Sequence, residues 1–357
     1  MVQTAAEAAA KKRSVRRSII TSVIGLIIMG ALFALLLPQL TSYEEAFSEL
    51  RDIAWPWLVA LAGSGILNIA LYPLTVLVAI AGLGYWKGFV QRQSGFLVSN
   101  AIPGGGAIAV GTQYAILAHY RVRATLAAAA VGADSVFTYL ITLGLPALAV
   151  TLLSIQGENA SALTVTAAVI GAIVIVVSVI LIVIVLRSDA GAIRVGKWGE
   201  QLTAPILRKF GKPVPDFETA LVDFRVDAHD LMRRRWLALF VTNFIAQTTP
   251  FLVLVCALAG LGGFEHVNFV EVFAAYSIAI VLTSFPITPG GLGTVDAALI
   301  ALLTSFGAPG SIAVAADLIW RLVWFLPQII AGAVAMIVYI IARNRRRKHP
   351  DPVDADQ

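Results

Sequence analysis

The sequence predicts an all-α, polytopic integral membrane protein. Apolar residues make up 59% of the 357 residues, charged residues only 13%, and the mean hydropathy is +0.85. A typical soluble domain is about 45–50% apolar and about 25% charged, so this chain cannot cover its own core with polar surface. The apolar runs are continuous and about twenty residues long, which is typical of spanning helices and not of barrel strands. A water-soluble enzyme is therefore excluded.

Six segments are predicted to cross the membrane as full helices because each is long and apolar enough. They are residues 18–40, 55–83, 124–153, 161–186, 236–261 and 311–342. The first follows the basic residues of 1–17 but lacks a cleavage site of small residues. We therefore expect a retained first helix rather than a signal peptide.

Two further apolar stretches, 94–119 and 269–306, are each interrupted in the middle. The interruptions are Pro103-Gly104-Gly105-Gly106 and the proline- and glycine-rich run from Pro286 to Gly293. Proline removes a backbone donor and glycine disfavours a helix. Each half has about 12 residues, or about 18 Å of helix, which is too short for a core about 30 Å thick. Both stretches are predicted to be re-entrant hairpins that enter and leave on the same side.

The charge distribution predicts the orientation. With both termini in the cytoplasm, the cytoplasmic segments 1–17, 84–93, 119–123, 187–235 and 343–357 hold 24 of the 26 basic residues. Only Arg51 and Arg321 fall elsewhere. Basic residues concentrate on the cytoplasmic side of membrane proteins, so this topology is favoured. We expect residues 1–17 and 344–357 to be cytoplasmic tails around a membrane domain of residues 18–343, and we expect the host membrane to be a bacterial inner membrane.

The two halves of the membrane domain, 18–153 and 161–343, are predicted to form an inverted repeat. The break at Pro103 and the break at Pro289 have opposite predicted orientations, and an aspartate follows them by 31 residues (Asp134) and 28 residues (Asp317). Broken helices that meet near the midplane are typical of alternating-access transporters. The water-facing segment 187–235 is interpreted as a linker, or alternatively as an amphipathic helix on the anionic inner leaflet.

The two breaks are the predicted binding site, because irregular backbone at membrane depth must be buried in protein or face a wet cavity. The half-helices that follow, 107–119 and 294–306, present unpaired amides and a positive dipole end to an anion. Tight packing of small residues is the alternative. The candidate residues are Pro103, Gly104, Gly105, Gly106, Thr112 and Gln113 at the first break, and Pro289, Gly290, Gly291, Gly293 and Thr294 at the second, with Ser99, Asn100, Ser284 and Thr288 as further neutral donors.

Four charged residues are predicted to lie inside the membrane, where each is costly unless paired or hydrated: Asp134, Asp296, Asp317 and Arg321. Arg321 is expected either to contact a substrate phosphate or to form a structural ion pair, and Asp317, four residues earlier, lies on the same helix face. Asp296 is in the first turn of a half-helix, where a carboxylate stabilises the terminus. Asp134 is expected to protonate, to accept hydrogen bonds or to pair with Arg321.

Other chemistry is not indicated. No Gly-Lys-Ser/Thr motif follows a glycine run, the four histidines are scattered, and Cys256 is the only cysteine. We therefore expect no nucleotide-driven motor, metal site, cofactor or nucleic-acid partner.

The segment Ile287–Leu299, with Pro289-Gly290-Gly291 and Asp296, resembles the signature of the lysylphosphatidylglycerol synthase transmembrane (flippase-like) family, and Ala101–Gly105 resembles its first proline-glycine element. The family usually has glutamate at the position of Asp296. The resemblance implies the flippase-like unit without an aminoacyl-transferase domain, because only a short tail follows the last span.

We therefore expect a non-enzymatic transporter that moves a phospholipid or a lipid-linked (polyprenyl-phosphate type) headgroup, anionic or zwitterionic, between leaflets. The expected partners are that lipid, the anionic lipids of the inner leaflet and a second copy in a homo-oligomer. The alternatives are a gradient-driven transporter of a small soluble solute and a non-transporting scaffold for envelope-lipid enzymes.

Overall fold

The computed structural model describes residues 53–102, 105–156, 188–209, 217–284 and 288–348, together with four single positions between 169 and 184. Every regular element in these ranges is a helix. Four segments of this part of the chain are long and apolar enough to cross a membrane: Trp55–Ala79, Ala124–Ile155, Arg233–Gly260 and Gly310–Arg346. They correspond to four of the six predicted spans. The predicted spans 18–40 and 161–186 lie outside the described residues, apart from the four single positions.

The first half contains α3, α4, a helical hairpin and one long helix. Their bounds are α3 (Trp55–Leu71), α4 (Leu74–Ala79), α5 (Tyr85–Ala101), α6 (Gly106–His119) and α7 (Ala124–Ile155). Pro73 separates α3 from α4, because proline cannot continue the hydrogen bonding of the preceding helix. The hairpin is formed by α5 and α6, which pack against each other on either side of the first break.

The second half repeats the motif of a broken hairpin followed by a long helix. Its elements are α9 (Asp189–Lys209), α10 (Phe217–Gly260), η2 (Gly263–Glu265), α11 (Phe269–Val281), η3 (Leu282–Ser284), η4 (Pro289–Gly291), α12 (Thr294–Ser305), α13 (Gly310–Trp320), η5 (Arg321–Phe325) and α14 (Leu326–Lys348). Asn268 begins α11 with a capping box, in which its side chain accepts from the amides of Val270 and Glu271 and the Glu271 carboxylate accepts from the Asn268 amide. η5 is a π-helical turn that joins α13 to α14.

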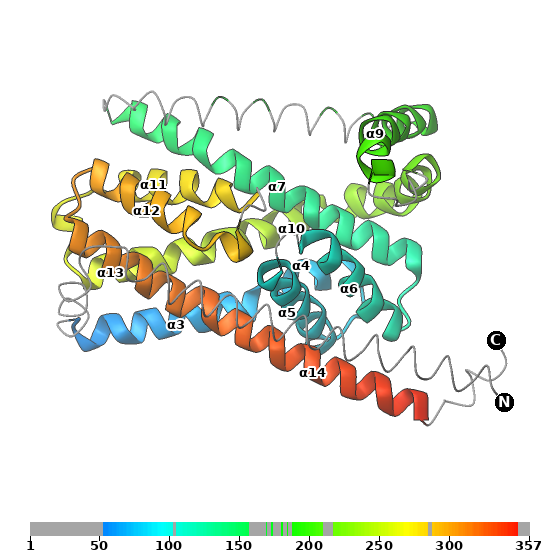
Figure 1. Cartoon of the computed structure of the whole chain (residues 1–357), viewed down its shortest axis with the longest axis horizontal. Helices are drawn as coiled ribbons and strands as arrows, with labels where there is room; N and C mark the ends of the chain where they lie inside the picture. The colour runs from blue at the N-terminus through cyan, green and yellow to red at the C-terminus, as the bar shows by residue number, and fades with distance from the viewer. Residues whose placement is uncertain are drawn as a thin grey trace.

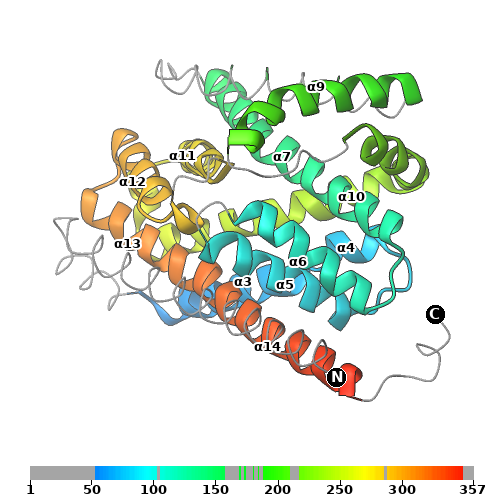
Figure 2. The ribbon, with the colours of Figure 1, turned by 45° about the vertical axis from the view of Figure 1, so that its right-hand side comes forward.

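The two hairpins lie between two long helical elements. Figures 1 and 2 show α7 along one side and the continuous rod of α13 and α14 along the other, with the α5–α6 and α11–α12 hairpins between them. The contacts agree with this view, since α5 packs on α14, α12 on α13, and both α6 and α11 on α7.

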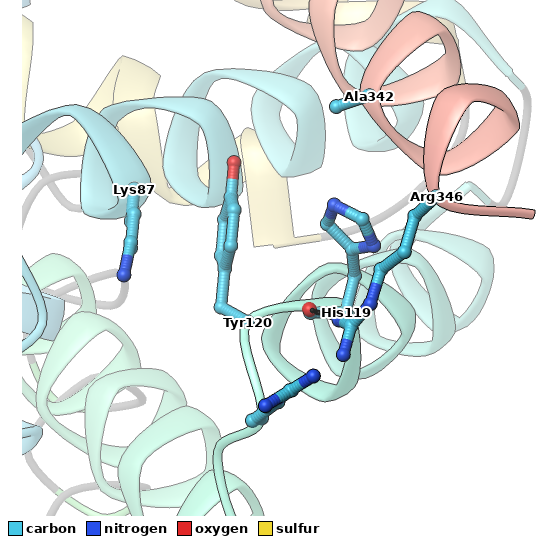
Figure 3. Close-up of a pocket in the computed structure, with 6 residues that line it drawn as sticks. Lys87, His119, Tyr120, Ala342 and Arg346 are labelled. Atoms are coloured by element: carbon cyan, nitrogen blue, oxygen red, sulfur yellow. Dashed lines mark hydrogen bonds between the residues drawn. The ribbon is translucent and has the colours of Figure 1, made fainter. Parts of the chain in front are cut away.

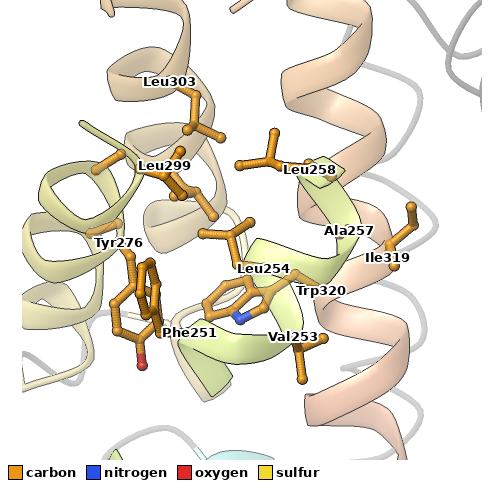
Figure 4. Packing of buried hydrophobic residues seen from close by; sticks show 14 of the residues in the cluster. Phe251, Val253, Leu254, Ala257, Leu258, Tyr276, Leu299, Leu303, Ile319 and Trp320 are labelled. Carbon is orange, nitrogen blue, oxygen red and sulfur yellow. The ribbon is translucent and has the colours of Figure 1, made fainter. Parts of the chain in front are cut away.

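A buried aromatic and aliphatic cluster fixes the second hairpin. Side chains from α10, α11, α12 and α13 converge in it (Figure 4). Two hydrogen bonds inside it link helices: Trp320 Nε1 donates to the carbonyl of Pro250 (2.9 Å), and the Tyr276 hydroxyl donates to the carbonyl of Gln247 (2.7 Å). These bonds satisfy polar groups that would be costly if left unpaired. α10 is therefore the support on which α11 and α13 are positioned.

One face of α14 is apolar and exposed. Leu326, Ile330, Val334, Val338 and Ile341 recur at intervals of three or four residues, and each exposes between 43% and 55% of its surface. An exposed apolar stripe of this length is unfavourable in water and is typical of a helix that contacts lipid chains. The fold is that of an integral, multi-pass membrane protein.

The first hairpin starts earlier than the sequence predicts. The apolar pattern places its start at residue 94, but α5 begins at Tyr85 and includes most of the segment 84–93, whose cytoplasmic location stays a prediction. Gln91, Arg92, Gln93 and Ser94 are all buried. The reason is close packing against α14, since a Cβ placed on Gly332 would lie only 2.5 Å from the carbonyl oxygen of Gln93.

The described parts of the segment 187–235 are mostly helical. It includes α9 and the start of α10, which continues from Phe217 through the predicted boundary at residue 236. The contact of this segment with a membrane surface stays a prediction.

Candidate functional site: a polar cavity between two broken hairpins

The two breaks lie next to each other. A Cβ placed on Gly290, in the second break, would lie 3.6 Å from the backbone carbonyl oxygen of Asn100, at the end of α5. η4 packs against α5 in the same region. The half-helices begin where the sequence predicts, with α6 starting at Gly106 and α12 at Thr294. Segments almost 190 positions apart in the chain are therefore brought together at their irregular backbone.

Arg321 holds the second break in place. Its Nε donates to Asp296 Oδ1 (2.5 Å), while Nη1 and Nη2 donate to the carbonyls of Gly290 (3.2 Å) and Gly291 (3.3 Å). Asp296 Oδ2 also accepts from the amide of Gly293 (2.6 Å), at the start of α12. The guanidinium is 1% exposed, so it crosslinks η5, η4 and α12 inside the protein. We call Arg321, Asp296 and the carbonyls of Gly290 and Gly291 the arginine clasp.

The clasp requires glycine at residue 290. Gly290 has a φ of +61°, a left-handed conformation that L side chains rarely adopt, and a Cβ there would lie 2.5 Å from Phe325 Cζ. The π-helical turn at Arg321–Phe325 shifts the register of α13 and α14 at this point. Backbone irregularity on both sides therefore lets the Arg321 guanidinium reach the break.

Asp317 is close to the clasp and is 3% exposed. It interacts electrostatically with Asp296 and Arg321. Its Oδ1 has no hydrogen-bond partner among the described residues. Arg321 donates to Asp296, so the shared helix face of Asp317 and Arg321 does not produce a direct ion pair between them.

A second buried ion pair lies in the first half. Arg92 Nη1 of α5 donates to Asp134 Oδ2 of α7, and the two side chains are 7% and 8% exposed. The Arg92 guanidinium also lies over the ring of Tyr72, 4.3 Å from the centroid. Pairing with Arg321, one of the alternatives expected for Asp134, does not occur, because Arg92 takes that place.

This ion pair is in the wall of a cavity of about 490 Å³ that is open to the surface on one side, where the lining residue Tyr139 is 53% exposed. Both hairpins border the cavity: Ser99 and Asn100 of α5 and Gly106 of the first break come from the first hairpin, and Thr283 and Ser284 of η3, just before the second break, come from the second. Amides from α3, α6, α10 and α14 also line it, namely Asn68, Gln113, Gln247 and Gln328, as do the rings of Tyr72, Phe96, Tyr139, Tyr276 and Trp324. The volume falls in the range of about 300–1,000 Å³ that is typical of ligand sites.

Several polar atoms of the wall have unused hydrogen-bonding capacity. Arg92 Nε, Asp134 Oδ1 and Gln328 Oε1 are buried and lack a hydrogen-bond partner within the described part of the chain. Other wall atoms form a network, since Gln328 Nε2 donates to Asn68 Oδ1 and Asn68 Nδ2 donates to Thr249 Oγ1 (2.7 Å). Buried polar atoms almost always have partners, so this wall is suited to a polar ligand.

The structure divides the predicted site residues into groups. Asp134, Gly106 and Gln113 line the cavity, and Gln113 Oε1 accepts from Gln91 Nε2 (2.6 Å). Thr112 does not line it, and its hydroxyl donates to the carbonyl of Ile108 within α6. Pro103 and Gly104 lie outside the described residues.

The remaining candidates belong to the second break rather than to the cavity wall. They are Arg321, Asp296, Asp317, Pro289, Gly290, Gly291, Gly293 and Thr294, and the buried Gly105 lies at the first break. The Thr294 hydroxyl lies 3.2 Å from that of Thr288 and donates to the carbonyl of Gly291. These contacts stabilise the turn that precedes α12.

Sequence reasoning missed Arg92, Asn68, Tyr72 and Gln328. The charge distribution counts Arg92 only as one of the basic residues of the predicted cytoplasmic segment 84–93, and no local pattern indicates its buried partner. Asn68 and Gln328 did carry a signal, since each is an amide inside a long apolar segment, where a polar side chain indicates an interior or wet position.

The fold and the cavity define a class: a polytopic helical membrane protein with a cavity that contains a buried ion pair and lies between two broken hairpins. The chain belongs to the lysylphosphatidylglycerol synthase TM region family, whose model matches residues 22–332. A curated relative, the UPF0104 membrane protein MJ1595 of Methanocaldococcus jannaschii, is 36% identical over 72 residues, which cover 20% of this chain and 21% of that protein. No solved structure matches the chain.

Proposed function

We propose that the protein is a non-enzymatic translocator that moves the headgroup of a phospholipid or lipid-linked substrate between the leaflets of a bacterial inner membrane. The observation that carries the proposal is the buried Arg92–Asp134 pair in the wall of a cavity bordered by both broken hairpins. Buried ionisable groups in membrane proteins mark substrate and ion pathways, because their cost requires a function or a partner. Membership of the family supports the proposal.

The cavity supports a phosphate-bearing headgroup that is zwitterionic or accompanied by hydroxyls. A guanidinium binds phosphate oxygens in a bidentate manner, and Asp134 is complementary to an ammonium group. The positive N-terminal end of α6, where Gly106 lines the cavity, adds to the attraction for phosphate. The neutral amides of the wall would bind hydroxyls.

Arg92 is the proposed phosphate contact, and Arg321 is proposed to be structural. Arg321 already donates to Asp296 and to two backbone carbonyls, which uses its three nitrogens. Arg92 lines the cavity and donates from Nη1 to Asp134, while its Nε has no hydrogen-bond partner among the described residues. Alternating opening around the two breaks would expose the headgroup to one leaflet and then the other, with energy from a gradient, the membrane potential or consumption of the product.

A reconstituted lipid-transfer assay tests this assignment. Full-length protein in proteoliposomes with a fluorescent phosphatidylethanolamine should translocate lipid, as measured by dithionite quenching of one leaflet. Arg92→Gln should slow transfer about 10- to 100-fold, since a charge-assisted hydrogen bond contributes about 1.5–3 kcal/mol. Arg233→Gln, which removes an exposed arginine, is the matched control.

The double variant Arg92→Gln/Asp134→Asn guards against a folding artefact, because it removes both charges and leaves neither one orphaned. Transfer at the wild-type rate by either variant would remove the ion pair from the mechanism. Inhibition of transfer by a soluble solute, with no dependence on lipid type, would favour the soluble-solute alternative.

A further inference from the structure

A second pocket lies away from the central cavity, where the start of α5, the end of α6 and the end of α14 meet. Its volume is about 340 Å³, and it is lined by Lys87, His119, Tyr120, Arg121, Ala342 and Arg346 (Figure 3). Three of the six lining side chains are permanently cationic, one is an imidazole and none is acidic. We propose that this pocket binds the phosphate group of an anionic membrane lipid from the adjacent leaflet.

The pocket is built by contacts between the three helices. Arg346 Nη1 donates to the carbonyl of His119 (2.8 Å), and Lys87 Nζ lies 5.7 Å from the ring centroid of Tyr120. The His119 ring contacts the rings of Tyr120 and Tyr339. Figure 3 shows Tyr120 between Lys87 and His119, with Arg346 beside His119. The cations are therefore held on a shared frame rather than scattered along a surface.

The backbone conformation of Arg121 independently supports a binding site at this pocket. It has a φ of 60°, the only positive φ of a non-glycine residue in the described part of the chain. Val122 N donates to the carbonyl of Leu117 (3.0 Å), which is the terminal bond of a Schellman motif, and glycine is the usual residue at the Arg121 position of that motif. Backbone strain retained at an arginine beside a basic pocket favours a binding role for its charge.

The pocket lies where the apolar stripe of α14 ends and basic residues begin, a position that indicates a lipid ligand rather than a soluble anion. The exposed apolar stripe of α14 ends at Ile341, and Arg343, Arg345 and Arg346 follow directly. Beside Lys87, Trp86 exposes 73% of its surface and contacts Tyr85 and Phe89. Aromatic residues next to basic ones are typical of the membrane interface, where lipid phosphates lie.

The dipole of α6 explains only part of the clustering of basic residues at this pocket. The negative end of α6 accounts for Arg346, which donates to the carbonyl of His119, the last residue of α6. It does not require Lys87 to approach from α5. General enrichment of basic residues on one membrane face would spread them along the ends of the helices, whereas here three helices bring them to one pocket.

Native mass spectrometry of the full-length protein tests the proposal. Detergent-purified protein is titrated with dioleoyl-phosphatidylglycerol and, separately, with dioleoylglycerol, which has the same chains without phosphate. Lys87→Gln/Arg346→Gln should weaken phosphatidylglycerol binding about tenfold or more, equivalent to the loss of at least one charge-assisted bond. Arg233→Gln/Arg234→Gln, which removes two exposed charges elsewhere, should have little effect.

Two further variants separate binding from folding. Lys87→Arg/Arg346→Lys keeps both charges and should retain affinity. Arg121→Gly should raise the melting temperature by relieving backbone strain while it weakens phosphatidylglycerol binding, a combination that a purely structural role does not produce.

Three results would overturn the proposal. They are an equal loss of phosphatidylglycerol affinity in Lys87→Gln/Arg346→Gln and in the Arg233→Gln/Arg234→Gln control, equal affinity of the protein for dioleoylglycerol and phosphatidylglycerol, and unchanged phosphatidylglycerol binding in Lys87→Gln/Arg346→Gln. Displacement of the lipid by millimolar inorganic phosphate would identify a soluble-anion site and overturn the lipid assignment. Because the assay measures binding alone, its outcome is independent of whether the central cavity translocates lipid.

Discussion

At the residue scale, the structure assigns different tasks to charges that look alike in the sequence. Arg321 is surrounded by acceptors at the second break, whereas Arg92 lines the cavity and its Nε has no hydrogen-bond partner among the described residues. Both are buried and paired with an aspartate, and breaking such a pair leaves an uncompensated charge. What distinguishes them is the number of acceptors around each guanidinium.

Gly290→Ala should destabilise the protein, because the new Cβ would collide with Phe325 in a backbone conformation that disfavours any side chain. We expect a loss of at least about 1–2 kcal/mol from the left-handed conformation alone. Gly111→Ala in α6 is the matched control, since a Cβ there meets nothing within 4 Å. It should be neutral or stabilising by about 0.5–1 kcal/mol. Thermal unfolding in detergent measures both, and equal stabilities would contradict the described turn.

Protonation of His119 should make the stability of the folded protein depend on pH. Partial burial, and then the charges of Arg346 and Arg343, lower the pKa of His119 from its ordinary value of 6.5. The unfolded chain therefore takes up the proton first as pH falls, so this stabilisation is present above pH 6.5 and is lost as pH falls through the lower folded-state pKa. His119→Gln should flatten the pH dependence of the melting temperature in this window. An unchanged profile would show that His119 does not contribute.

At the element scale, the arginine clasp links η4 and α12 of the second hairpin to η5 in the rod of α13 and α14. Breaking a buried ion pair by removing one partner costs about 3–5 kcal/mol, whereas replacing both partners can be close to neutral. Asp296→Ala should therefore be severely destabilising. Asp296→Ala/Arg321→Leu should recover much of the loss.

A double-mutant cycle measured by thermal unfolding checks this expectation. If Arg321 serves only the clasp, the recovered double variant should also retain lipid transfer. Recovered stability without transfer would instead show that Arg321 has a role in translocation beyond the clasp.

The sequence predicted these elements well where length and composition decide them. The four described spans and the starts of both half-helices follow from apolar length and from proline and glycine. Prediction from the sequence fails where contacts between distant segments decide the structure. The run Gln91–Ser94 is polar enough for a loop, and only close packing of α14 at Gly332 makes it a helix interior. The partner of Asp134 is 42 positions earlier in the chain, a distance at which no local pattern specifies contact.

At the scale of the whole molecule, both halves place a broken hairpin beside a long helix, and both hairpins contribute to the wall of one cavity. The two halves do not place the arginine and the aspartate of their ion pairs on corresponding elements. In the first half the arginine is on the hairpin and the aspartate on the long helix, whereas in the second half these positions are exchanged. An inverted repeat remains the hypothesis that links this arrangement to alternating access.

Cysteine accessibility in membranes tests the central claim most directly. In a Cys256→Ala background, single cysteines are introduced at Ser99 and Thr138, which line the cavity, and at Ile330, which is 55% exposed on the apolar face of α14. A charged, water-soluble methanethiosulfonate reagent requires hydrated thiolate. We predict that the cavity positions are modified, that a translocated lipid protects them, and that position 330 is not modified. Cavity positions as inert as the lipid-facing control would contradict a hydrophilic chamber between the two breaks.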